Sequence, residues 1–456
     1  MPFLSRLRRP GTRKAGAVAL TVAVAALMAA CGGDHPDSIF HQRTEFNREV
    51  DFLFKILIYA GTAVFIFVEA ILIWTLIKYR ARPGQAEPEH VHGNTTLEIA
   101  WTVIPLIILA IIGFPTVKII MKTQAKARGD ALQVEVIGHQ WWWEFRYPQF
   151  TTTGANGRVD TLVTANELYL PLGKTVNFAL KTKDVIHSFW IPALAGKRDL
   201  ISNHTNYLWF TPDSATEGAW NGACVEYCGA SHANMRFKTF TVTQADFDSW
   251  TAHQLTPAVG SAAPTAPAPA AAAAAPTTGA AAPAQTQAQT STPAANQPGA
   301  GVPASPAPQT PVTQAGFIAF PREKLPTYTI PQTPIPAGLN FDDNLLPNGN
   351  PANGAVLLGK GSCVGCHVIR GNPMMVLPIG PNLTHVGSRT TIAAGLFPND
   401  PRHLARWIKN APKMKPGILM PTIGAGEYDP VRKTMSLVKL TDAEIADLVA
   451  YLNTLK

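Results

Sequence analysis

Two long apolar runs near the N-terminus constrain the fold more than any other feature of the chain. Residues 56–77 contain one charged side chain, Glu69, and residues 99–120 contain only Lys118. At roughly 1.5 Å per residue, each run would span about 33 Å as an α-helix, which is enough to cross a bilayer. We therefore expect a multidomain membrane protein anchored by a hairpin of two transmembrane helices, over residues 51–80 and 97–121.

The basic residues around these runs do not settle the orientation of the hairpin. Three of them, at positions 78, 80 and 82, favour a cytoplasmic turn over residues 81–96, but four more between positions 118 and 128 flank the opposite end. The N-terminus decides instead. Residues 1–30 are typical of a secretory signal peptide, because a basic start precedes an apolar run over residues 15–30. An exported segment, residues 31–50, and two crossings then return the chain to the outer side of the membrane.

The end of this signal contains the first of five cysteines. Residues 28–32 (MAACG) resemble a bacterial lipoprotein cleavage site, with Cys31 as the lipidated first residue of the mature chain. The alternative is cleavage nearby and an unmodified Cys31. Five basic residues lie within the first 14 positions, and without them the formal charge of +8 falls to +3. The charge therefore does not indicate a nucleic-acid partner.

Soft and borderline metal ligands are concentrated in a stretch of twelve residues, 224–235. Cys224, Cys228, His232 and Met235 all lie in it, and His187 stands upstream at a predicted strand end. Such ligands suit copper. Two thiolates in one loop can bridge two metal ions, with a histidine on each side and the methionine completing the coordination. A zinc site would use Cys and His without Met, and a blue-copper site would need only one Cys.

This pattern, C-x-E-x-C-x-x-x-H-x-x-M after an upstream V-I-H-S-F-W, resembles the binuclear copper centre (CuA) of cytochrome c oxidase subunit II. The resemblance implies that Cys224 and Cys228 bridge the two coppers. It also implies that His187 and Met235 ligate one copper and that His232 ligates the other.

Three further residues receive their roles only from this resemblance. The backbone carbonyl of Glu226 would ligate the second copper, and its carboxylate would face a magnesium or manganese site shared with the large subunit. Trp141, the first tryptophan of the G-H-Q-W-W-W stretch, would be the residue through which electrons enter, unless all three rings only pack. Glu98 would stand at the mouth of a proton path. Its alternative role is an interfacial carboxylate near a helix N-terminus.

The region around the copper motif has the pattern of a β-domain. In residues 130–252, apolar Leu132, Val134 and Val136 alternate with polar residues, and further short β-rich runs are broken by Gly, Pro and Asn. With the ligands in loops at one end, this predicts an all-β, cupredoxin-like Greek-key barrel.

Residues 253–315 are dominated by Ala, Pro, Thr and Gln, without apolar periodicity. This composition predicts a disordered linker, which would reach roughly 40 Å and contribute reach rather than contacts. Residues 316–345 are expected to form an extended lead-in to the last domain.

Residues 346–456 contain Cys363, Cys366 and His367 as a C-x-x-C-H motif. In such motifs two thioethers hold haem c covalently and the histidine takes one axial position. Each cysteine of the chain thus falls within a motif that explains it, so no disulfide is expected.

The order of motifs around this site resembles the all-α class I cytochrome c. The resemblance implies that the carbonyl of Pro381 accepts a hydrogen bond from His367 and that Met420 is the sixth ligand, with Met414 as the alternative. Met/His ligation favours a high potential and leaves no open iron position. At the end of the chain, Thr441 and Glu444 predict a capping box that starts the C-terminal helix.

Together the two resemblances imply subunit II of a haem–copper oxidase with a fused cytochrome c domain, expected in a bacterial inner membrane with both redox domains on the periplasmic side. Its expected partners are subunit I, subunit III, membrane lipid, and an electron donor such as cytochrome c or a quinol–cytochrome c reductase complex. Electrons would run from haem c to the binuclear copper and on to subunit I, where oxygen is reduced and protons are translocated. The chain lacks the histidines to reduce oxygen alone.

Two alternatives remain at this stage. A nitric oxide reductase subunit could use the same copper centre, and the metal content of the large subunit would distinguish it. A copper-delivery protein also uses C-x-x-x-C plus His, but it has neither the methionine nor a haem. A quinol oxidase subunit is excluded by the copper ligands.

Overall fold

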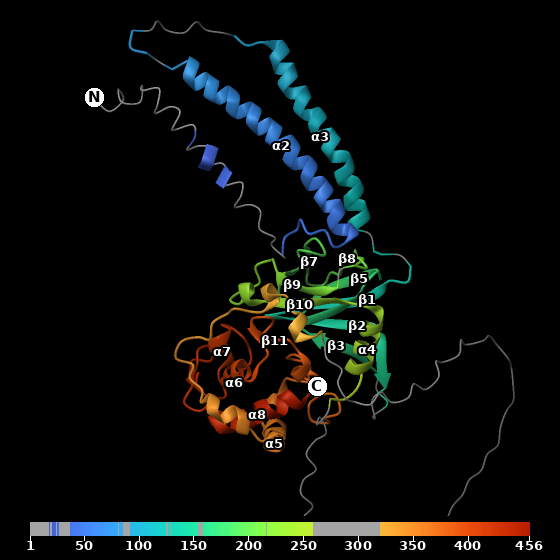
Figure 1. Ribbon diagram of the computed structural model, residues 1–456, viewed down its shortest axis with the longest axis vertical. Helices are drawn as coiled ribbons and strands as arrows, with labels where there is room; N and C mark the ends of the chain where they lie inside the picture. Colours follow the sequence, from blue (N-terminus) through green and yellow to red (C-terminus); the bar gives the residue numbers. More distant parts are fainter. Residues whose placement is uncertain are drawn as a thin grey trace, which may run out of the picture. The chain divides into compact units, whose positions relative to one another are not determined.

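The computed structural model describes residues 37–80, 82–84, 92–124, 126–127, 129–153, 157, 159–215, 217–258 and 320–456, together with positions 18, 21–23, 25 and 26. Cys31, most of the signal segment and nearly all of the linker lie outside the described residues. The molecule is shown in Figure 1.

Two long helices confirm the predicted membrane hairpin. Helix α2 spans Glu45–Lys78 and α3 spans Thr95–Gln124, and both are long and apolar enough to cross a membrane. They converge at the ends beside the β-domain, where Lys122 near the end of α3 pairs with Glu49 near the start of α2 (Figure 1). Helix α2 starts six residues before the expected position because Thr44 caps it, accepting a hydrogen bond from the backbone N–H of Asn47.

The same N-terminal cap ties α2 to the β-domain. Thr44 donates its hydroxyl to the carbonyl of Leu194, and the Asn47 amide donates to that of Pro192. The ring of Phe46 fills the space beside Gly196, where a Cβ would come within 2.7 Å of it. The N-terminal end of the first transmembrane helix therefore packs directly against the β-domain.

The predicted cupredoxin-like barrel consists of two five-stranded sheets. The first has the order β3-β2-β1-β5-β8 and the second β4-β10-β9-β6-β7, and the pairs β1–β5 and β4–β10 are parallel. The strands are β1 Leu132–His139, β2 Trp142–Thr153, β3 Val159–Ala165, β4 Glu167–Pro171, β5 Val176–Thr182, β6 His187–Trp190, β7 Arg198–Leu200, β8 Asn206–Phe210, β9 Gly218–Cys224 and β10 Arg236–Val242.

Aromatic side chains fill the space between the two sheets. Trp143 of β2 packs edge-on against Phe237 of β10, with ring centroids 5.3 Å apart, and Phe178 of β5 lies 5.6 Å from Phe189 of β6. All four rings are fully buried. Burying such large apolar surfaces is the main driving force for closing one sheet on the other. Helix α4, Gln244–Gln254, completes this domain and buries Phe247 and Trp250.

Residues 320–345, called the strap below, are not merely extended. They include the short 3₁₀ turns η3, Arg322–Lys324, and η4, Thr327–Thr329, and lead into η5, Asp343–Asn348. Phe320 packs on Phe240 of the barrel, with ring centroids 5.3 Å apart. At the other end, Leu339 and Phe341 belong to the hydrophobic core of the C-terminal domain.

The C-terminal domain is built around two crossing helices, α5 (Pro351–Lys360) and α8 (Asp442–Thr454). They approach so closely that a Cβ on Gly354 would lie 2.0 Å from the carbonyl oxygen of Asp447, so only glycine fits there. The capping box predicted for Thr441 and Glu444 is present.

Short elements complete this domain. They are η6 Ser362–Gly365, η7 Val386–Ser388, α6 Pro401–Lys409 and α7 Ala411–Met414, with the two-stranded pairs β11 Thr391–Ile392 with β12 Phe397–Pro398 and β13 Tyr428–Asp429 with β14 Thr434–Met435. The predicted helical core is confirmed, and the short β pairs lie in its connecting loops.

Candidate copper and haem sites

Neighbouring strands of the second sheet bring the expected copper ligands to one end of the barrel. His187 opens β6 and Cys224 closes β9, and these strands pair antiparallel. The chain then forms the ligand loop, residues 224–235, which contains the turn η2, His232–Asn234, and ends at β10. The ligand atoms of His187, Cys224 and Cys228 all lie within 4.8 Å of one another, which is close enough to hold a metal ion.

The distances within this cluster suit a sulfur-bridged site. The two thiol sulfurs are 3.7 Å apart. Nδ1 of His187 lies 3.7 Å from the sulfur of Cys224, and Nδ1 of His232 lies 3.6 Å from the sulfur of Cys228. The sulfur of Met235 is 3.9 Å from that of Cys228. The structure thus brings together all five side chains that the sequence singled out.

The backbone of the ligand loop adds a sixth donor. The carbonyl of Glu226 lies 3.3 Å from the sulfur of Cys224, while its side chain is exposed. The hydrogen bond between the two cysteines, together with His187, lowers the pKa of Cys224 and raises that of Cys228, so the metal-free pair shares one proton. The donor set of two sulfurs, two imidazoles, a thioether and a carbonyl fits copper.

Asp184 orients the buried imidazole of His187. Its carboxylate lies 2.8 Å from Nε2, which leaves Nδ1 directed at Cys224. Burial opposes ionisation of Asp184, but hydrogen bonds from His187 and from the backbone N–H groups of Gln140 and Val185 lower its pKa overall. Likewise, burial disfavours the charged imidazole, but the bond to Asp184 raises the pKa of His187 overall. A carboxylate behind a ligand histidine is a common outer-shell arrangement at metal sites.

The three consecutive tryptophans have different surroundings. Trp143 is fully buried in the barrel core, and Trp142 stacks on His139 with ring centroids 4.1 Å apart. Trp141 is half-buried, and its indole N–H donates to the carbonyl of Cys228 at 2.9 Å. The Gln140 amide donates to the same carbonyl at 2.8 Å. The ring N–H of Trp143 also reaches the ligand loop, at the carbonyl of Met235, over a longer distance of 3.5 Å.

The C-x-x-C-H motif of the C-terminal domain comes shortly after α5, begins in η6 and ends just beyond it. Cys363, Cys366 and His367 are half-buried. Nδ1 of His367 lies 2.7 Å from the carbonyl oxygen of Pro381, which is the contact that the cytochrome c resemblance implies. Burial lowers the pKa of His367, which favours the neutral imidazole that ligates iron. The donor chemistry of these residues therefore fits a haem.

The two candidate methionines differ in environment. Met414, at the end of α7, is 4% exposed and belongs to the hydrophobic core. Met420 lies in the loop that follows and is half-buried. Packing in the hydrophobic core is enough to explain Met414. Met420 lies outside that core.

Two carboxylates from the sequence analysis lie on the membrane helices. Glu98 is exposed in the first turn of α3, and Glu69 is half-buried in α2. The structure brings neither of them to the copper or haem residues.

Sequence reasoning missed three residues that contact these sites. Asp184 and Gln140 adjoin expected site residues in the chain, but no pattern assigned them a role. Lys415 belongs to a stretch noted only for its methionine, and it is buried against Trp141, almost 275 positions away in the sequence. Only the tertiary fold could reveal that contact.

These features define a membrane-anchored protein with a cupredoxin-like barrel that carries a copper-type ligand cluster, followed by a cytochrome-type domain. Family models agree with this. The transmembrane domain of cytochrome c oxidase subunit II matches residues 43–119, its periplasmic domain matches residues 132–242, and cytochrome c matches residues 351–456. The match to the periplasmic domain implies copper in the barrel, and the match to cytochrome c implies haem in the C-terminal domain.

Individual relatives point the same way. A probable cytochrome c oxidase subunit 2 of Rickettsia bellii is 34% identical over 207 residues, 43% of this chain and 76% of the relative. The cytochrome c oxidase subunit 2 of Alkalihalophilus pseudofirmus is 28% identical over 410 residues, 89% of this chain and 86% of that protein. The chain belongs to the cytochrome c oxidase subunit II family.

A solved structure is also similar to part of the chain. It is the periplasmic domain of cytochrome oxidase subunit II of Bradyrhizobium japonicum, with 29% identity and a TM-score of 0.24, covering 28% of this chain and 96% of that one.

Proposed function

We propose that the chain is the subunit through which electrons enter a bacterial respiratory haem–copper oxidase. The observation that carries this proposal is the convergence of two cysteines, two histidines and a methionine at one end of the barrel, in a chain that also has a C-x-x-C-H domain. When bound, the haem and the copper pair supply the one-electron chemistry by which electrons from an external donor reach the oxygen-reducing centre of subunit I.

The residues of the chain divide this work. Cys224 and Cys228 would hold both coppers, and His187, His232, Met235 and the carbonyl of Glu226 would complete the ligand set. Asp184 keeps the ring of His187 turned toward the cysteines. Trp141 would be the residue through which electrons enter the ligand loop, because its half-buried ring donates to the Cys228 carbonyl, whereas Trp143, which reaches the Met235 carbonyl, is fully buried in the barrel core.

In the C-terminal domain, Cys363 and Cys366 would attach haem c covalently, and His367 and Met420 would hold its iron. The carbonyl of Pro381 holds the ring of His367 through Nδ1. A ligand pair of this type leaves no iron position open to oxygen, which suits a domain that only passes electrons.

The exposed carboxylates are proposed to serve the partner subunits. The Glu226 side chain contributes to a magnesium or manganese site shared with subunit I, and Glu98 stands at a proton path into it. Both redox domains lie on the periplasmic side of the inner membrane, Cys31 anchors the mature N-terminus by its lipid, and subunit III completes the complex. The electron donor is a cytochrome c or a quinol–cytochrome c reductase complex.

The decisive experiment is to purify the intact complex and to determine its metals and its paramagnetic resonance spectrum. We expect one covalent haem c and two coppers in this chain, with a single unpaired electron shared between the two copper nuclei. Substitution Cys228→Ser should abolish the shared signal, whereas Tyr227→Phe, at the exposed neighbouring position, should leave it intact. A single type 2 copper in the wild type would overturn the proposal.

A further inference from the structure

The segment that carries Met420 lies directly on the ligand loop of the barrel. We call residues 415–420 the Met420 segment. Its Gly417 has a φ of +83°, and a Cβ there would come within 3.0 Å of both the Trp141 ring and the Ala230 side chain. The hydroxyl of Ser231 donates to the carbonyl of Pro416. The C-terminal domain therefore covers this face of Trp141 with its own chain.

Lys415 joins the two domains at this point. Its side chain is 2% exposed, and Nζ donates to the carbonyl of Trp141 at 2.6 Å and to that of Ala393 at 3.1 Å. The first carbonyl belongs to the barrel and the second to the C-terminal domain. Burial lowers the pKa of Lys415 to about 7, and both the ammonium and the neutral amine can donate these two bonds. A buried polar group without such partners would be costly, so the two carbonyls fix the side chain.

Trp141 is thereby held from two sides. Its backbone carbonyl accepts from Lys415, while its ring donates to the carbonyl of Cys228. A short series of contacts thus leads from the Met420 segment through one tryptophan to a copper-ligand residue.

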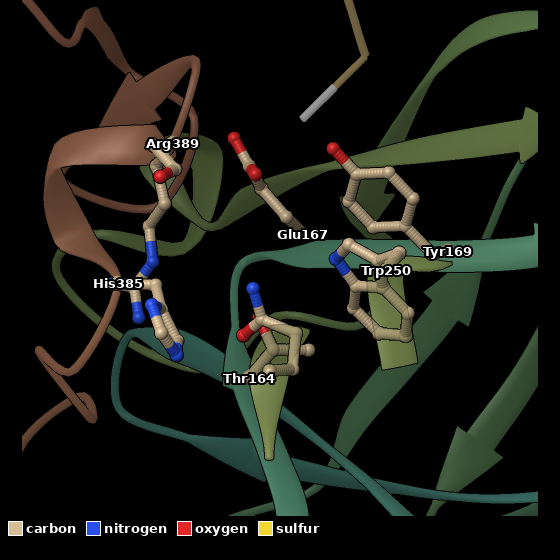
Figure 2. Close-up of a pocket in the computed structure, with 8 residues that line it drawn as sticks. Thr164, Glu167, Tyr169, Trp250, His385 and Arg389 are labelled. Carbon is tan, nitrogen blue, oxygen red and sulfur yellow. The ribbon is translucent and has the colours of Figure 1, made fainter. Parts of the chain in front are cut away.

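A second group of buried contacts, away from Trp141, holds the domains together. Glu167 of β4 is buried and accepts from the N–H and the hydroxyl of Thr390, both at 2.7 Å. Figure 2 shows Arg389 and His385 of the C-terminal domain around a small pocket whose other wall includes Glu167, Tyr169 and Trp250 of the barrel domain.

The strap adds a third group of contacts. Lys238 of β10 is buried and donates to the carbonyl of Thr329, and the Tyr328 hydroxyl donates to the carbonyl of Ala219 at 2.9 Å. The strap therefore fixes the start of the C-terminal domain on the second sheet of the barrel.

We propose that Lys415 is a positioning residue that holds the Met420 segment on Trp141 and so maintains the contact between the C-terminal domain and the ligand loop of the barrel. The inference rests on the proposed function and deepens it, because it identifies the contact between the two redox domains and the residue that maintains it.

The test uses the full chain in its intact complex and compares Lys415→Met with Lys413→Met. The control lysine lies in the same part of the domain, but its Nζ donates to the carbonyl of Gly338, within the C-terminal half of the chain. Two quantities are measured: oxidative labelling of Trp141 by hydroxyl radicals, and the rate at which flash-reduced haem c passes its electron to copper. Haem and copper spectra are recorded for each variant.

Lys415→Met loses two buried hydrogen bonds. Labelling of Trp141 should therefore rise at least several-fold, and haem-to-copper transfer should slow by roughly tenfold or more. The haem and copper spectra should stay unchanged. Lys413→Met should stay within about twofold of the wild type, as expected for a change outside the interface. Wild-type labelling and transfer in Lys415→Met would overturn the inference, as would a haem spectrum showing that the methionine ligand was lost.

A second variant covers the case in which Lys415→Met fails to fold. Ala230→Arg places a long side chain at the same contact from the barrel side, where Ala230 faces Gly417. We expect the same rise in Trp141 labelling and the same slower transfer, and wild-type values would overturn the inference. Absence of the two-copper signal in the wild type would instead refute the proposed function.

Discussion

At the scale of single residues, the two candidate methionines should separate cleanly by experiment. Met420→Ala should lower the haem potential and open the sixth position to added ligands, because a thioether ligand favours the reduced iron. Met414 is buried in the core, so Met414→Ala should instead cost roughly 2–5 kcal/mol of stability and leave the haem spectrum unchanged. Redox titration, ligand binding and thermal unfolding distinguish the two effects. Ligand binding by Met414→Ala alone would show that the assignment is reversed.

Asp184 offers a second residue-scale prediction. Asp184→Asn keeps the size of the side chain but removes the charge that holds Nε2 of His187 at 2.8 Å. Outer-shell changes of this kind typically weaken metal binding by about 10–100-fold, and we expect a loss in that range for copper. Competition with a copper chelator measures it. Asp199→Asn, at an exposed position on the adjacent strand β7, is the control, and equal affinities in the two variants would refute the orienting role.

At the scale of elements, the first turn of α3 carries the proposed proton-path residue. Glu98→Gln should slow steady-state turnover, because a neutral amide cannot exchange the proton, while reduction of copper by haem c stays unchanged. The two rates are measured on the same preparation by oxygen consumption and by flash reduction. Unchanged turnover would mean that Glu98 is only an interfacial carboxylate at a helix N-terminus.

Elements with strong local signals could be predicted from the sequence. The apolar runs predicted α2 and α3, the alternation at Leu132, Val134 and Val136 predicted the buried face of β1, and the Thr441–Glu444 pair predicted the start of α8. Each signal depends on neighbours within a few positions, so no tertiary information was needed. The clustering of the candidate copper ligands was predictable for a similar reason, since four of the five side chains lie within twelve residues.

Elements whose form depends on distant partners could not be predicted. The strap has no periodicity of its own, and its 3₁₀ turns are fixed by contacts such as the one between Lys238 and Thr329, 91 positions apart. Helix α2 begins early because Thr44 and Asn47 bond to carbonyls near residue 193. Lys415 is the extreme case, because its partner Trp141 is 274 positions away.

At the scale of the whole molecule, these contacts change what the linker is expected to do. Composition alone suggests a tether, and cutting a tether makes transfer bimolecular and dependent on dilution. The strap, the Glu167–Thr390 contact and Lys415 instead provide buried polar contacts between the two redox domains. Cutting should then have little effect.

This can be measured by inserting a protease site within residues 259–319 of the full chain. After cleavage, the fragment that contains residues 320–456 should stay with the membrane, and haem-to-copper transfer should remain independent of protein concentration. Added salt should matter little, since buried contacts are weakly screened. Release on dilution at neutral pH would show that the linker is needed to hold the domain in place.

The same cleaved protein should respond to acid through His385. This ring lies 4.5 Å from that of His253 of α4, next to Arg389, and its Nε2 contacts the carbonyl of Thr256 at 3.1 Å. Burial, with the nearby His253 and Arg389, lowers the pKa of His385 to about 3 in the docked state. A ring released to solvent would titrate near 6.5. The docked state therefore binds fewer protons, and docking should be complete above about pH 6.5 and weaken as the pH falls below it.

At pH 5, protonation of the released His385 ring should weaken docking by up to about 30-fold. This is the factor expected when the released imidazole has its usual pKa near 6.5. Glu167 acts in the opposite sense, because burial raises the pKa of its carboxyl and protonation there favours the docked state. Glu167 is present in both the wild type and His385→Asn, so its contribution cancels when the two proteins are compared at the same pH. Fragment release is measured by sedimentation at pH 5 and pH 7.5. The wild type should release more fragment than His385→Asn at pH 5 and the same amount at pH 7.5. If the two proteins released equal amounts at pH 5 as well, His385 would not couple docking to pH.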